Sequence, residues 1–215
     1  GEDLKLEALG TLHSTGYQAV ALKKSNIKTL EDIKGKKIAI GEPGGGAETF
    51  FEALVEAAGW NMNEFKTVYL PYDQAAEQMQ DGLIDVMIVV GGMPTASVES
   101  LATTHEVTLI SIPSNVVSAY IQKTPSTSVE RVEAGIYKGV DEPVDVFVER
   151  IQLGSRAGLD PDIAYRIAKA LYSNLDVLAT YHSVAKGIKI EYAHEAVVPL
   201  NEGAKKYFQE IVNIK

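Results

Sequence analysis

The sequence contains no cysteine. Without thiols it has no cysteine nucleophile, no disulfide and no cysteine-ligated zinc site. The absence does not fix the compartment, because cysteine-free chains occur in reducing and oxidising compartments alike. A thiol-free protein is nevertheless well suited to the periplasm.

Long apolar runs and clusters of positive charge are also absent. The longest apolar stretch, Leu83–Val90, is interrupted by Asp85 and is far shorter than a membrane span. Twenty basic residues are scattered among 29 acidic ones, for a net charge of −9, which disfavours nucleic acid or an anionic membrane as partner. Gly1–Asp3 carry no signal-peptide pattern, so we expect any export signal to have been removed or to lie outside this sequence.

Catalytic patterns are few. The histidines show no HxxxH or HExxH spacing, and no G-x-S-x-G motif is present. We interpret His105, His182 and His194 as ordinary surface or packing residues. His13 is a candidate ligand-binding residue, because it follows a short apolar run and precedes the loop Ser14–Gly16. We therefore expect no enzymatic activity, no cofactor and no metal ion.

The chain does show an α/β pattern, in which short apolar strands alternate with amphipathic helices. The expected strands are residues 17–22, 36–41, 65–70, 83–90, 107–112 and 144–153. The expected helices are residues 29–33, 47–58, 73–80, 95–104, 160–181 and 202–212. This alternation predicts βαβ units and mostly parallel sheets with flanking helices. Residues 123–128 (KTPSTS) are the best candidate for a linker.

The strongest local feature is the strand–loop–helix at Ile38–Leu54. Its glycines let the backbone approach a ligand closely, and the following helix points free N–H groups at that ligand. It is not a Walker A loop, because Gly46 is followed by neither lysine nor Ser/Thr, and it is not a dinucleotide fingerprint, because Thr49 stands where the third glycine belongs. The alternative is a tight turn that binds nothing.

A second strand–glycine–helix feature spans Val90–Ser97, where Thr95 or Ser97 is expected to cap the helix or bind a ligand. In a parallel sheet both loops lie at the same edge, the edge at which open α/β sheets bind ligands. Glu48 has three possible roles: capping its own helix, pointing outward, or accepting an ammonium group. The predicted ligand-binding residues of the two loops are Gly44, Gly45, Gly46, Ala47, Glu48, Thr49, Gly91, Gly92, Pro94 and Thr95.

Several stretches resemble known families. Two stretches resemble sequence motifs of two-lobed periplasmic solute-binding proteins: Ile27–Gly41 (IKTLEDIKGKKIAIG) and Asp81–Asp85 (DGLID). Four more stretches resemble, in order, the TAXI family of TRAP-transporter solute receptors. They are Gly41–Gly46 (GEPGGG), Gly91–Val98 (GGMPTASV), Ala134–Val144 (AGIYKGVDEPV) and Pro199–Phe208 (PLNEGAKKYF).

The resemblance implies an exported, periplasmic receptor with a cleavable signal peptide. Such a receptor binds a small carboxylate or amino acid, of the glutamate, glutamine or 2-oxoacid class, and delivers it to integral membrane TRAP permease subunits. Tyr137 lies in a stretch that resembles a family loop, and it is expected to line the ligand site from the opposite lobe. The family loop commonly reads Gly-Ser-Gly-Thr where this chain has Gly44–Ala47, and its terminal motif has His-Pro where this chain has Asn201-Glu202.

The resemblance also implies a two-lobed periplasmic-binding-protein-like α/β fold with a ligand cleft between the lobes. We expect residues 1–24 and 113–215 to form the first lobe and residues 25–112 the second. The chain is expected to cross near Leu12–Tyr17 and Ile112–Ala119. Family members begin with a further glycine-rich βα unit, so the N-terminal part of the first lobe is expected to be missing.

Three other readings of the same fold remain open. An effector-binding domain of a transcription regulator would need a helix-turn-helix, and none is visible. An enzyme such as a deaminase or a pyrimidine-precursor synthase would need a catalytic cysteine or a His/Asp cluster. A surface antigen that no longer binds solute is the third.

Overall fold

The computed structural model describes residues 5–212, which belong to two compact units. Unit 1 comprises Gly1–Ser14 and Arg150–Lys215, and unit 2 comprises Thr15–Glu149. The chain therefore changes unit once between Leu12 and Tyr17, and again at Glu149. These bounds differ from the predicted lobes, because residues 15–24 and 113–149 lie in the unit that holds residues 25–112.

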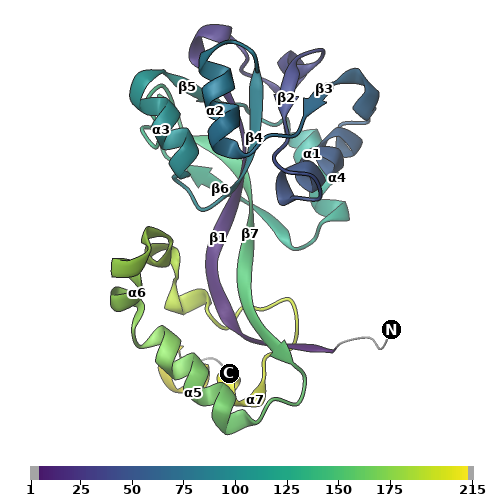
Figure 1. Ribbon diagram of the computed structural model, residues 1–215. Helices are drawn as coiled ribbons and strands as arrows, with labels where there is room; N and C mark the ends of the chain where they lie inside the picture. The colour runs from purple at the N-terminus through teal and green to yellow at the C-terminus, as the bar shows by residue number, and fades with distance from the viewer. Residues whose placement is uncertain (1–4, 213–215) are drawn as a thin grey trace. The chain divides into compact units, whose positions relative to one another are not determined.

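The strands form one mixed sheet (Figure 1). Its order is β3-β2-β4-β1-β7-β6, and β5 pairs with β1. Pairs β2–β3 and β2–β4 are parallel, whereas β1–β4, β1–β5 and β6–β7 are antiparallel. The strands are β1 (Leu6–Leu22), β2 (Lys37–Ala39), β3 (Lys66–Val68), β4 (Val86–Gly91), β5 (Val107–Leu109), β6 (Thr127–Val132) and β7 (Val144–Arg156).

The expected α/β class with flanking helices is confirmed, but the sheet is not mostly parallel. The helices of unit 2 are α1 (Gly46–Ala57), α2 (Tyr72–Gln80), α3 (Ala96–Thr104) and α4 (Ser114–Lys123). Those of unit 1 are α5 (Pro161–Tyr172), α6 (Leu175–Tyr181) and α7 (Glu202–Val212). Short 3-10 segments cover Lys23–Ser25, Leu30–Ile33, Met62–Glu64, Ser183–Gly187 and Ile190–Tyr192.

The sheet of unit 2 is buried on both faces at β4. Val86 and Ile88 face the cluster that contains α1 and α4, while Met87 and Val89 face the cluster that contains α2 and α3. Successive strand side chains point to opposite faces, so a strand covered on both sides must be continuously apolar. This is why the run of residues 83–90 shows no alternation.

Unit 1 has its own core around the crossing of α5 and α7. Ala164 and Ala168 of α5 pack with Tyr207 and Phe208 of α7. The predicted single helix over residues 160–181 is wrong, because α5 ends at Tyr172 and α6 begins at Leu175. The Asn174 amide donates to the Ala170 carbonyl at 2.7 Å, a local bond that competes with continued helix.

The predicted linker at residues 123–128 is also wrong. It holds the end of α4 and the start of β6, and Thr127 is only 4% exposed. The hydroxyls of Ser126 and Thr127 donate to the Glu149 carboxylate of β7. A polar segment that resembles a connector is thus part of the sheet, because its hydroxyls find a carboxylate partner distant in sequence.

Candidate functional site

Three strand ends meet at one edge of the unit 2 sheet. Strands β2, β3 and β4 are parallel neighbours, so the loops that follow them lie at the same edge. We call these loops the loop edge: Gly41–Thr49, Tyr69–Tyr72 and Gly91–Thr95. The Leu70 N–H donates to the Gly41 carbonyl at 2.9 Å, and the Val90 N–H donates to the Tyr72 hydroxyl at 3.1 Å. The two predicted glycine loops are therefore brought together.

The first turn of α1 supplies backbone donors. The Gly45 N–H donates to the Glu42 carbonyl at 3.0 Å, and the Thr49 N–H donates to the Gly45 carbonyl at 3.2 Å. No side chain caps this helix, so within the described residues the N–H groups of Gly46, Ala47 and Glu48 are the ones left for a ligand. Gly45, which we predicted as a donor, is used by its own loop.

Glu48 does not cap its own helix, the first of the three predicted roles, but binds the loop that precedes the helix. Its carboxylate accepts the Gly44 N–H at 2.6 Å and the Tyr69 hydroxyl. The Tyr69 hydrogen bond, followed by that from Gly44, lowers the pKa of the Glu48 carboxyl, so Glu48 is ionised at neutral pH. Segments 40–49, 69–73 and 90–97 contain no lysine or arginine. The loop edge therefore combines backbone donors with an anionic side chain.

The second loop is held by a closed hydrogen-bond network. The Thr95 N–H donates to the Tyr137 hydroxyl at 2.8 Å, and that hydroxyl donates to the Gln18 side-chain carbonyl at 2.8 Å. The Gln18 amide donates to the Thr95 hydroxyl at 2.9 Å, which donates to the Gly92 carbonyl at 2.9 Å. These bonds fix the loop and occupy the polar atoms of Thr95.

Tyr137 therefore differs from its expected role. It lies in unit 2, the unit of the glycine loops, rather than in the opposite lobe, and it is only 2% exposed. Burial raises the pKa of its hydroxyl, which stays protonated and able to donate. Gln18, 1% exposed, is the residue that the sequence analysis missed, and a glutamine within an apolar strand was the available signal.

Ser97 and Pro94, two other residues predicted at the second loop, differ from each other in solvent exposure. Ser97 is 5% exposed, and within residues 5–212 its hydroxyl has no hydrogen-bond partner. Pro94 is exposed and follows a cis peptide bond.

His13 lies in unit 1, on β1, whereas the glycine loops lie in unit 2. Burial, followed by the electrostatic interaction with His182, lowers the pKa of His13 from 6.5. Its partly buried ring is therefore neutral at pH 7.

The depressed pKa of His13 predicts a loss of stability in acid. As the pH falls below 6.5, His13 takes up a proton in the unfolded chain before it does so in the folded one. Stability present above pH 6.5 is therefore lost progressively as the pH falls through the folded pKa. Urea midpoints measured above and below this pH should differ less in His13→Asn than in wild type, and equal differences would refute the assignment.

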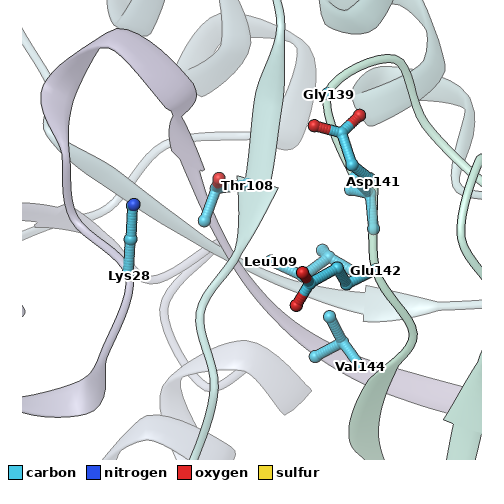
Figure 2. Close-up of a pocket in the computed structure, with 8 residues that line it drawn as sticks. Lys28, Thr108, Leu109, Gly139, Asp141, Glu142 and Val144 are labelled. Atoms are coloured by element: carbon cyan, nitrogen blue, oxygen red, sulfur yellow. The ribbon is translucent and has the colours of Figure 1, made fainter.

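A separate cavity of about 290 Å³ lies in unit 2, on the side of β5. Figure 2 shows Lys28 and Thr108 on one side of it and Asp141 and Glu142 on the other. Asp141 is paired with Lys23. None of the predicted site residues lines this cavity.

Among residues 5–212, no three or more His, Asp or Glu side chains are placed to hold a metal ion. No helix in the described part of the chain is long and apolar enough to cross a membrane.

The fold and the loop edge define an α/β protein that presents glycine-rich turns at one edge of a mixed sheet. The chain belongs to the NMT1-like family, whose model matches residues 1–211.

Solved structures with similarity to the chain include the periplasmic aliphatic sulphonate binding protein SsuA from Escherichia coli. The two share 12% identity with a TM-score of 0.48, over 99% of this chain and 56% of that one. An ABC uptake transporter substrate binding protein from Streptococcus pneumoniae, with bound histidine, shares 15% identity with a TM-score of 0.45, over 86% of this chain and 61% of that one. Substrate binding domain 2 of GlnP from Lactococcus lactis shares 10% identity with a TM-score of 0.44, over 89% and 64%. The chain thus spans less than two thirds of the length of each of these structures.

Proposed function

We propose that this protein is a solute-binding receptor that holds the carboxylate of a small solute at the loop edge of unit 2. The observation that carries the proposal is the first turn of α1, where Gly46, Ala47 and Glu48 present N–H groups with no partner in the described residues. A helix N-terminus favours negative charge through these groups and its dipole. The neighbouring Gly91–Thr95 loop is braced by Tyr137 and Gln18, so little ordering cost remains on binding.

The charge of the loop edge favours an amino acid over a dicarboxylate. Glu48 is ionised, its hydrogen bonds come from the uncharged groups Tyr69 and Gly44, and the loop segments contain no lysine or arginine. A second carboxylate on the solute would be repelled by Glu48, whereas an ammonium group would be attracted. Glutamine, which has an ammonium group and a single carboxylate, is therefore favoured most, and 2-oxoglutarate, which has two carboxylates and no ammonium group, is favoured least.

The resemblance of the sequence to TAXI receptors supports the wider assignment. On this proposal the protein is exported to the periplasm, catalyses no reaction, and delivers its solute to a TRAP-type membrane permease. The loop edge offers hydrogen-bond donors and two carboxylates, those of Glu42 and Glu48, which suit binding better than group transfer.

Calorimetric titration tests the proposal. Several charge-assisted hydrogen bonds, each worth about 1.5–3 kcal/mol, would give a Kd of about micromolar order for glutamine or glutamate. We expect 2-oxoglutarate to bind more weakly than glutamine. The variant Glu48→Gln should reduce this difference in affinity. Native mass spectrometry of protein purified without added solute would first show whether a solute is retained. If none of the three solutes binds, and none is retained, the proposal is wrong.

A further inference from the structure

Glu149 is the last residue of unit 2, and hydroxyl groups surround its carboxylate. One oxygen accepts the Tyr17 hydroxyl of β1. The other accepts Ser126 at 3.1 Å and Thr127 at 3.0 Å, and Thr127 is its direct partner in the β6–β7 ladder. No lysine or arginine in residues 5–212 pairs with this carboxylate. It therefore ties β1 and β6 to β7 through neutral donors alone.

The ring of Tyr17 continues this link into the helix that carries the free N–H groups. Its centroid lies 4.7 Å from that of Phe50, which is 1% exposed and lies on α1, one turn after Gly46. Phe50 also packs against Tyr120 and Phe147, with centroids 5.7 and 6.0 Å away. Tyr17 is thus fixed at its hydroxyl by β7 and at its ring by α1.

The next residue along β7 is held by different partners. Arg150, the first residue of the second segment of unit 1, pairs with Glu195 and lies 4.7 Å over the ring of Tyr192. Glu149 is therefore the final side chain that anchors β7 within unit 2.

We propose that Glu149 is a positioning residue for the solute site: through Tyr17 and Phe50 it holds the first turn of α1 in the arrangement that presents the N–H groups of Gly46–Glu48. The inference rests on the proposed function. Glu149 does not need to touch the solute, because its effect passes through the Tyr17 ring.

The test compares Glu149→Gln and Tyr17→Phe. Glutamine keeps the size of the side chain, but its amide nitrogen can only donate, so the side chain no longer accepts all three hydroxyl groups as the carboxylate does. Tyr17→Phe removes the hydroxyl that donates to Glu149 and keeps an aromatic ring packed on Phe50. Each variant should raise the Kd for glutamine by about 3- to 10-fold, and the double variant should be no worse than either single one.

Amide hydrogen exchange without solute provides an independent readout. Amides of residues 44–50 should exchange faster in both variants than in wild type. The matched control is Glu210→Gln, which makes the same exchange of carboxylate for amide at the side chain that accepts the Tyr165 hydroxyl at 2.7 Å in unit 1, and it should change neither readout.

Each outcome decides the inference. Unchanged exchange at residues 44–50 in both variants overturns it. A weaker affinity with unchanged exchange would mean that Glu149 contacts the solute directly, which also overturns a positioning role. If wild type binds no solute, the proposed function fails, while faster exchange in the two variants would still support the link from Glu149 to α1.

Discussion

Replacing Gly203 with alanine is expected to destabilise unit 1 by more than about 3 kcal/mol. Gly203 lies in the first turn of α7, where that helix packs on α5. A Cβ at this position would clash with the Pro161 carbonyl group and would lie 2.8 Å from the Tyr165 nitrogen. Backbone atoms cannot rotate away as a side chain can, so relief requires the two helices to separate and the core between them to open.

Chemical denaturation followed by circular dichroism measures this effect. The matched control is Gly154→Ala, also in unit 1, where an added Cβ would meet only the Glu7 carbonyl at 3.6 Å. That distance is an ordinary contact, so the control should unfold near the wild-type midpoint. If Gly203→Ala unfolds at the same denaturant concentration as Gly154→Ala, the close packing of α5 and α7 is not as described.

Replacing Gly46 with proline is expected to weaken solute binding about 10- to 100-fold, the equivalent of one charge-assisted hydrogen bond. Gly46 is the first residue of α1, a position that tolerates proline because its N–H has no helical partner. Gly45 is already extended, with φ −84° and ψ 167°, as the residue before proline must be. The substitution therefore removes a donor and leaves the helix intact.

The control for this variant is proline at the first residue of another helix. Glu202→Pro changes the first residue of α7 in unit 1, and it should leave the affinity for glutamine unchanged. Calorimetry of both variants, with thermal melts to confirm folding, gives the comparison. Wild-type affinity in a folded Gly46→Pro variant would show that the Gly46 N–H does not contact the solute.

Much of the fold follows from local pattern. The helical period of the apolar residues in α1 is a property of neighbouring residues. So is the cap of α5, where the Asp160 carboxylate accepts the Asp162 and Ile163 N–H groups at 2.9 and 3.2 Å. The position of β1 is not such a property. It lies between β4 and β7 and is antiparallel to β4, and only the packed sheet determines these pairings.

In the candidate site, too, some features follow from local sequence and others depend on residues distant in sequence. Glycines after two buried strands predicted the two loops of the site, because parallel strands place such loops at one edge. The braces of those loops were not predictable, since Tyr137 and Gln18 are 119 positions apart in the sequence. The hydrogen bond between Glu48 and Tyr69, 21 positions apart in the sequence, was not predictable either.

The most direct test of a carboxylate held at α1 is an NMR titration of the ¹⁵N-labelled protein with glutamine. The amide signals of Gly46, Ala47 and Glu48 should shift strongly, because their N–H groups gain an anionic acceptor. The Gly45 amide, which donates to Glu42, should shift less. Glutamine binding that leaves the three amide signals unchanged would contradict the account.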